Sequence, residues 1–183
     1  EQLQQYPILK GFRHILQAEH PSFMLQQSFL NGIAALQQYN FTYDILITPT
    51  QLASAIQLVQ QHPNQLFVID HLAKPYIKAG LIDEWKKDIL TIAQYSNVYC
   101  KISGMVTEAD CTSWKYADFI PYLDVVVEAF GTKRIMYGSD WPVCLLAASY
   151  KNALAIVQQY FATFSENEKQ AFFANNAAQF YHL

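Results

Sequence analysis

The sequence has little charge and no long apolar run. Charged residues make up 15% of its 183 residues and the net charge is −3, so it lacks the basic field that attracts nucleic acid. No apolar run is long enough to span a bilayer, and the polar start Glu1–Gln5 is not followed by the apolar core of a signal peptide. These absences argue against nucleic-acid and membrane partners.

Cysteine and glycine are also sparse. The three cysteines, Cys100, Cys111 and Cys144, are odd in number and match no zinc-knuckle spacing, which predicts a reducing, cytoplasmic setting. The six glycines form no phosphate-binding loop of the P-loop or dinucleotide-binding type. Apolar residues are abundant by contrast, at 52% of the chain, and predict a single globular domain over residues 1–183.

Five short β-rich runs alternate with helical patterns along the chain. The runs are Gly11–Leu16, Tyr43–Thr48, Leu66–His71, Val98–Gly104 and Arg134–Asp140. They are almost continuously apolar rather than alternating, which is typical of parallel strands buried on both faces. Strands that alternate with helices predict βαβ units and an α/β fold.

Two helix starts are marked by capping patterns. Thr48 has the character of an N-cap, with Pro49 at the first helical position and Gln51 closing a capping box. Ser165 and Glu168 repeat the capping box near the end of the chain. We therefore expect helical segments to begin directly after Thr48 and Ser165.

Polar side chains gather where the predicted strands end. His71, Lys101 and Asp140 lie at or near the carboxyl ends of their runs, and Arg13 and His14 follow Phe12. In a barrel this rim is where catalytic residues assemble, and in an open doubly wound sheet the same edge binds ligands. The pattern predicts a site at this edge and leaves both architectures open.

Two aspartates are expected to be structural. Asp44 lies at the start of its run, at the wrong end for catalysis. Asp70 precedes His71, and successive side chains of a strand point to opposite faces, so Asp70 should point away from His71.

Several segments carry a family resemblance. Tyr137–Pro142, Val68–Pro75 and Cys100–Gly104 together resemble the amidohydrolase-related family of lactonases and decarboxylases. Within that family the chain looks most like the sugar-lactone hydrolases of the fuconolactonase and rhamnonolactonase type. The resemblance continues through Gly11–His14, Tyr43–Asp44 and Asn176–Tyr181, and so covers nearly the whole chain.

The resemblance implies a TIM (β/α)8 barrel of the metal-dependent-hydrolase type. Gly11–Leu16 would be about its fourth strand and Arg134–Asp140 its eighth. A complete barrel needs about 250 residues, so we expect this chain to hold only about the last five βα units, with the N-terminal strands missing. The family's first strand ends in a His-x-His pair, and the 5 histidines here form no such pair.

Asp140 and His71 are the catalytic residues that the resemblance implies. The counterpart of Asp140 activates the hydrolytic water, and an ionised carboxylate can accept that proton. The counterpart of His71 points into the site, where an imidazole can polarise a carbonyl or ligate a metal. The alternatives are an aspartate that stabilises a Gly-Ser-Asp-Trp-Pro turn and a histidine that closes its strand.

Further residues are candidates for substrate binding. Arg13, His14, Lys74 and Lys101 carry groups that bind substrate oxygens or a carboxylate product. Each can instead pair with a protein carboxylate. Trp141 is a candidate wall for a sugar ring, with a packed core tryptophan as the alternative.

We expect either no required cofactor or one zinc or manganese ion, with His71 and Asp140 as its candidate ligands. The expected function is hydrolysis of a sugar-acid lactone by water that Asp140 activates. One alternative is decarboxylation or C–C hydrolysis of an aromatic acid. Another is a catalytically silent barrel fragment that forms a homodimer through its open sheet edges. A third is an unrelated doubly wound domain, with a reversal in its strand order.

Overall fold

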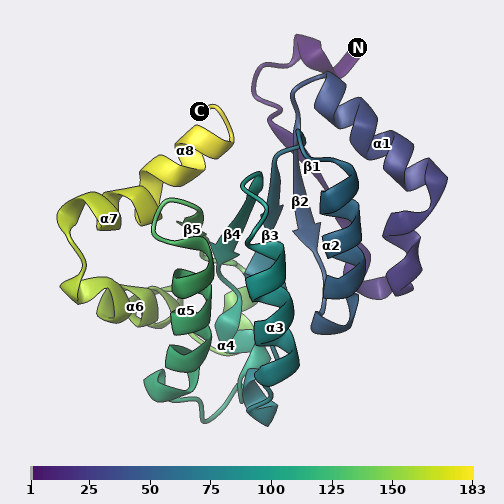
Figure 1. The fold of residues 1–183 in the computed structure, drawn as a ribbon. Coiled ribbons are helices and arrows are strands. Elements are labelled where there is room, and N and C mark those ends of the chain that lie inside the picture. The colour runs from purple at the N-terminus through teal and green to yellow at the C-terminus, as the bar shows by residue number, and fades with distance from the viewer. Residues whose placement is uncertain (1) are drawn as a thin grey trace.

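Five parallel strands form one sheet, in a computed structural model that describes residues 2–183 (Figure 1). All five predicted runs are confirmed, as β1 (Gly11–Ile15), β2 (Thr42–Leu46), β3 (Phe67–Ile69), β4 (Val98–Ile102) and β5 (Ile135–Tyr137). The spatial order is β1-β2-β3-β4-β5, and every neighbouring pair is parallel. This order contains no reversal, so the doubly wound alternative is wrong and the sheet is a segment of a (β/α)8 barrel.

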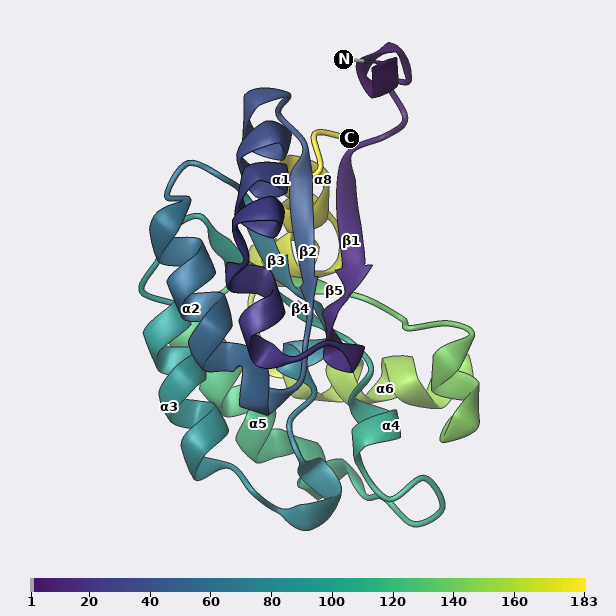
Figure 2. The same cartoon turned by 90° about the vertical axis from the view of Figure 1, so that its right-hand side faces the viewer.

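Helices cover one face of this sheet, which we call the helix face (Figures 1 and 2). They are α1 (Gln27–Gln38), α2 (Leu52–Gln61), α3 (Asp83–Ile92) and α5 (Tyr116–Phe130), with α6 (Tyr150–Tyr160) packed beside α5. The short α4 (Met105–Glu108) follows β4. None of the helices described within residues 2–183 has the length and apolarity needed to cross a membrane.

The main core lies between the sheet and these helices. Ile45, Phe67 and Cys100 of the strands are fully buried there, together with Leu52 of α2 and Phe119 of α5. Burying a large apolar side chain stabilises the fold by roughly 1.5–3 kcal/mol. The helix face therefore supplies most of the apolar stabilisation of the described chain.

The opposite face, which we call the inner face, carries a small apolar cluster and several charges. The chain ends in α7 (Glu166–Gln170) and α8 (Asn176–Phe180), and α8 lies on this side of the sheet (Figure 2). Phe180 packs there with Val68 of β3 and Met136 of β5. The next residue, Tyr181, reaches Asp44 and Lys101 on the same face.

Both predicted capping boxes are present. Thr48 and Gln51 cap a short 3-10 turn that leads into α2, and Ser165 and Glu168 cap α7. Gln51 has a second role, because its Nε2 donates to the backbone oxygen of Leu16 at 2.7 Å. This bond ties the segment after β1 to the start of α2.

Candidate active site

His71 and Asp140 meet at the carboxyl ends of β3 and β5. The Nε2 atom of His71 lies 3.7 Å from Oδ1 of Asp140, and their side chains are only 12% and 13% exposed. Since β4 lies between these two strands, the pair spans three neighbouring strand ends. The structure thus brings the two predicted catalytic residues together on one rim.

A left-handed turn aims His71 at this rim. His71, Leu72, Ala73 and Lys74 all have φ between 53° and 57°. His71 Nδ1 lies 2.7 Å from Ser103 Oγ, and Asp70 Oδ1 accepts a bond from Lys101 Nζ at 2.6 Å.

Ser103 follows β4 directly, and a Cβ atom added at Gly138 would lie 3.0 Å from Ser103 Cβ and 3.1 Å from Lys101 Cδ, so the two side chains lie on the same side. Asp70 and His71 therefore share one side of the sheet. The prediction that Asp70 points away from His71 is wrong, because the left-handed backbone of His71 breaks the strand alternation.

Tertiary contacts hold this unfavourable backbone in place. A left-handed conformation costs a residue other than glycine roughly 1–2 kcal/mol. Trp85 Nε1 of α3 donates to the backbone oxygen of Leu72 at 2.7 Å, and Lys74 forms an ion pair with Glu108 of α4. Backbone strain of this kind concentrates at functional sites, where the surrounding structure maintains it.

Asp140 also has a left-handed backbone, with φ of 52°. Its backbone oxygen accepts a bond from Cys144 N at 2.8 Å, which anchors the loop. Its carboxylate accepts no hydrogen bond from any residue in the range 2–183, so its oxygens are available to water or a ligand. Trp141 is 63% exposed beside it, which excludes a packed core position for this indole.

An alternating network of charges lies next to the pair on the inner face. Asp70, which is fully buried, accepts from Lys101 Nζ at 2.6 Å and from Arg13 Nη1 at 2.9 Å. Lys101 Nζ also bonds Asp44 Oδ2 at 2.9 Å, and Tyr181 Oη donates to the same Asp44 oxygen at 2.8 Å. Two cations and two carboxylates therefore neutralise each other.

The pKa values of these groups reflect burial and pairing. Burial raises the pKa of the Asp70 carboxyl, but the cations of Lys101 and Arg13 outweigh it and hold that pKa below its ordinary value. Burial lowers the pKa of Lys101, but Asp70 and Asp44 outweigh it and raise that pKa. Burial lowers the pKa of His71 despite the opposing carboxylates of Asp70 and Asp140, which favours a neutral imidazole.

The predicted substrate-binding cations are not all near the pair. Arg13 is 48% exposed at its side chain, so donors not bonded to Asp70 face solvent on the inner face. His14 follows it on the helix face, where it stacks on the Phe23 ring at 5.4 Å and its Nε2 lies 3.1 Å from Glu19. The ammonium group of Lys74 forms an ion pair with the carboxylate of Glu108. The structure therefore groups Arg13 with Lys101 and places His14 away from the pair. Lys74 is bonded to Glu108 but stays close enough to His71 for its charge to lower the pKa of that imidazole.

The sequence reading missed Ser103 and Tyr181 as residues of the site. The sequence could have indicated Ser103, because it lies two positions after Lys101 in the predicted run Val98–Gly104, and alternation along a strand would place the two on one face. Tyr181 ends the segment Asn176–Tyr181, which carries the family resemblance, but no local pattern indicates its contact with Asp44, from which 137 residues separate it.

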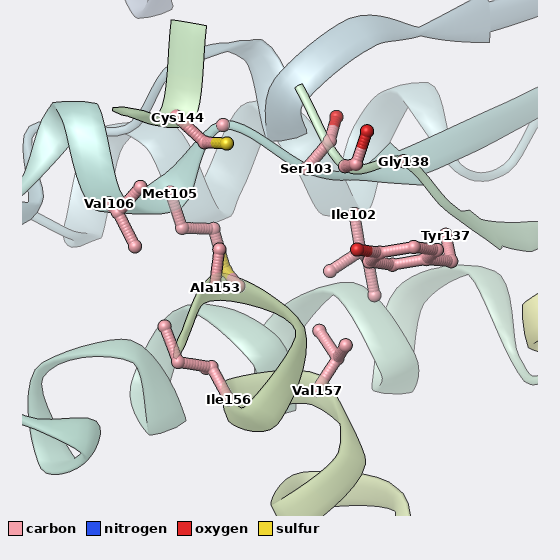
Figure 3. A pocket seen from close by; sticks show the side chains of 12 residues that line it. Ile102, Ser103, Met105, Val106, Tyr137, Gly138, Cys144, Ala153, Ile156 and Val157 are labelled. Atoms are coloured by element: carbon pink, nitrogen blue, oxygen red, sulfur yellow. The ribbon is translucent and has the colours of Figure 1, made fainter. Parts of the chain in front are cut away.

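A small cavity lies behind the rim, between the ends of β4 and β5 and helix α6 (Figure 3). It is lined mainly by Ile102, Ser103, Tyr137, Cys144 and Val157 and encloses about 20 Å³. That volume holds about one water molecule, which excludes a sugar lactone from it. Any substrate must therefore approach His71 and Asp140 from the inner face or the rim.

Gly104 packs against both members of the pair. A Cβ atom at this position would lie 2.9 Å from His71 Nδ1 and 3.1 Å from Asp140 Oδ2, and Gly104 has φ of 63°. We predict that Gly104→Ala displaces the pair and lowers activity by about 100-fold, the effect of a misplacement near 1 Å.

Gly80→Ala is the matched control. Gly80 has φ of 65°, but no atom lies within 4 Å of its added Cβ. Both variants should lose roughly 1–2 kcal/mol of stability from the left-handed backbone, and only Gly104→Ala should lose activity. Chemical denaturation and steady-state kinetics measure the two effects, and equal activity in both variants contradicts this packing role.

His71 and Asp140 are suitable as two ligands of one divalent ion. Zinc binds tetrahedrally to N and O ligands at about 2.0–2.2 Å, so two of its ligands lie about 3.4 Å apart. The observed 3.7 Å between Nε2 and Oδ1 is close to that separation. Within residues 2–183 no group of three His, Cys, Asp or Glu residues is arranged to hold a metal, so the described chain offers two ligands of the usual four.

Comparisons with known proteins identify the relatives of this chain. The chain is 36% identical over 187 residues to an L-fucono-1,5-lactonase of Burkholderia multivorans, covering 96% of the chain and 63% of the relative. It is 32% identical over 185 residues to an L-fucono-1,5-lactonase of Burkholderia ambifaria, covering 97% of the chain and 62% of that relative. The chain thus spans less than two thirds of the length of these relatives.

A solved structure and a family profile complete the comparison. A crystal structure of a Burkholderia multivorans amidohydrolase with bound zinc superposes with a TM-score of 0.92 at 35% identity, over 95% of this chain and 64% of that one. The profile of the amidohydrolase family matches residues 5–183. The chain therefore belongs to the amidohydrolase family and is similar to its sugar-lactone hydrolases.

Proposed function

We propose that the protein hydrolyses a sugar-acid lactone at the His71–Asp140 pair. The observation that carries the proposal is the pair itself, with Nε2 and Oδ1 3.7 Å apart at the carboxyl ends of β3 and β5. The lactonase names of the relatives support a cyclic sugar ester as the substrate class. The neutral inner-face network beside the pair suits a polar, uncharged substrate.

In the proposed reaction Asp140 acts first as a base. Its carboxylate accepts a proton from a water molecule as the water oxygen bonds to the lactone carbonyl carbon. His71 stabilises the negative charge that develops on the carbonyl oxygen, by donating a hydrogen bond from Nε2. When the ring C–O bond breaks, Asp140 returns the proton to the leaving oxygen, and the product is an open hydroxy acid.

A divalent ion bound by His71 and Asp140 would polarise the carbonyl and make the water more acidic. The remaining roles belong to the chain. Arg13 would bind substrate oxygens through its exposed donors, beside Lys101, which two carboxylates hold in place. Trp141 would offer an exposed indole face to the sugar ring.

A substrate comparison tests the proposal. A pH-stat assay should record acid release from L-fuconolactone and L-rhamnonolactone, and no reaction with hydroxylated benzoates. Turnover of the benzoates alone would favour the decarboxylase alternative. Activity that requires extending residues 1–183 by further N-terminal βα units would support the silent-fragment alternative for this chain.

Trp141→Ala should weaken substrate binding without stopping the chemistry. Losing an aromatic stacking contact of about 0.5–1.5 kcal/mol corresponds to a KM increase of roughly 2- to 13-fold. Since the indole is largely exposed, little stability should be lost. Trp141→Phe retains an aromatic face and should restore most of the affinity. An unchanged KM in Trp141→Ala removes this residue from the substrate site.

A further inference from the structure

Ser103 is the only residue in the range 2–183 that hydrogen-bonds Nδ1 of His71, the ring nitrogen that is not paired with Asp140. Its Oγ lies 2.7 Å from Nδ1, and Ser103 is 4% exposed. Its hydroxyl makes no other hydrogen bond with any residue in the range 2–183. Ser103 also lines the one-water cavity, but its hydroxyl points away from Ala153 and Val157, which close the far side of that cavity (Figure 3). Within the described residues, the two groups therefore depend on each other.

Because neither group has another partner among the described residues, one direction of the hydrogen bond between Ser103 Oγ and His71 Nδ1 is favoured. A neutral imidazole carries its proton on one nitrogen and a lone pair on the other. If Ser103 donates to Nδ1, the hydroxyl hydrogen and the Nδ1 lone pair are both satisfied. If Nδ1 donates instead, the Ser103 hydrogen has no acceptor among the described residues, which is unfavourable for a buried polar group.

The surroundings leave Ser103 little freedom to turn away. A Cβ added at Gly138 would lie 3.0 Å from Ser103 Cβ, so β5 passes very close on that side. On the other side, the carbonyl of Gly104 accepts a bond from Thr107 Oγ1 at 2.9 Å, which fixes the following turn. Ser103 is therefore held between β5 and the His71 ring.

We infer that Ser103 is a positioning residue that fixes His71 as the tautomer with its proton on Nε2. The inference rests on the proposed function, since it explains how His71 presents a hydrogen-bond donor to the lactone carbonyl. In this tautomer Nε2–H is directed toward Asp140 and the reacting atoms, and the ring needs no further proton to act.

The same hydrogen bond bears on metal binding. A metal on Nε2 requires the proton to move to Nδ1, which would then donate to Ser103. The hydroxyl hydrogen of Ser103 would then have no acceptor among residues 2–183. Ser103 thus favours the donor role of His71 over the role of metal ligand.

Nuclear magnetic resonance tests the tautomer directly. The protein is labelled with 15N-histidine. The His71 signals are those that disappear from the spectrum of the His71→Asn variant. The expected spectrum without added metal shows a protonated Nε2 and an unprotonated Nδ1. A protonated Nδ1 overturns the inference, and this measurement needs no Ser103 variant to fold.

Ser103→Ala tests the effect on catalysis. We expect kcat to fall roughly 10- to 100-fold, the scale for losing a group that orients a functional histidine, with little change in KM. The His71 signals should shift toward a mixture of tautomers. Ser96→Ala removes an exposed serine hydroxyl at the opposite end of β4 and should change neither readout. An unchanged tautomer or an unchanged kcat in Ser103→Ala contradicts the inference.

The two proposals fail in different ways. Lactone hydrolysis together with a protonated Nδ1 rejects the role of Ser103 and keeps the proposed function. A protonated Nε2 with no hydrolysis of any lactone rejects the proposed function and leaves the hydrogen-bond assignment in place.

Discussion

Replacing Asp140 by asparagine is expected to slow lactone hydrolysis by about 10²- to 10⁴-fold, the usual contribution of a general base. The amide has the same shape as the carboxylate but cannot accept the proton of water. Asp140 accepts no hydrogen bond from residues 2–183, so the exchange should leave the fold intact. We therefore expect a loss in kcat without a loss in melting temperature.

The measurement is a comparison of kcat and thermal melting for the two proteins. Glu128→Gln, which neutralises an exposed carboxylate on α5, is the control and should retain wild-type activity. Retention of more than about a tenth of the wild-type kcat in Asp140→Asn would remove this residue from the role of base.

Lys101→Met should cause the largest loss of stability. It leaves the fully buried Asp70 with one cation, Arg13, and removes the cation bonded to Asp44. Removing one partner of a buried ion pair typically costs about 3–5 kcal/mol, because the remaining charge stays buried without compensation. Lys87→Met on the exposed side of α3 should change stability by no more than about 0.5 kcal/mol.

The loss should depend on pH in a defined direction. In the wild type the pKa of Asp70 is lowered, so its ionised form stabilises the fold at neutral pH and this contribution is lost as the pH falls through the lowered pKa. Burial already raises the pKa of Asp44 in the wild type, against the opposing charge of Lys101. Without Lys101, the pKa of Asp44 should rise further and that of Asp70 should rise from its lowered value, so the folded state takes up protons more readily.

Urea denaturation should therefore show a larger destabilisation at pH 7 than near pH 4, close to the ordinary pKa of aspartate. A destabilisation of equal size at both pH values would show that lost packing, and not the unpaired carboxylates, causes it.

Local patterns in the sequence predicted most of the fold. The five strands follow from continuous apolar runs, and the turns at Thr48 and Ser165 follow from capping chemistry that acts within four residues. The choice between a barrel and a doubly wound sheet depended on strand order, which no local pattern contains. The resemblance to a family supplied it, and the observed order confirms it.

The site could be predicted only in part. The rule that polar side chains gather at strand ends located His71 and Asp140. The expected alternation of side chains along a strand failed for Asp70, because four consecutive left-handed residues without a glycine give no signal in the sequence. The turn exists because distant groups hold it, with Trp85 on the carbonyl of Leu72 and Glu108 on Lys74.

The central claim is that His71 and Asp140 act together on one small molecule. A crystal structure of the Asp140→Asn variant with a bound sugar lactone tests it most directly. We predict the lactone carbonyl oxygen within hydrogen-bond distance of His71 Nε2, with the carbonyl carbon facing residue 140. A lactone bound away from both side chains, for example in the outer groove beside Tyr76 and Trp85, would contradict the account.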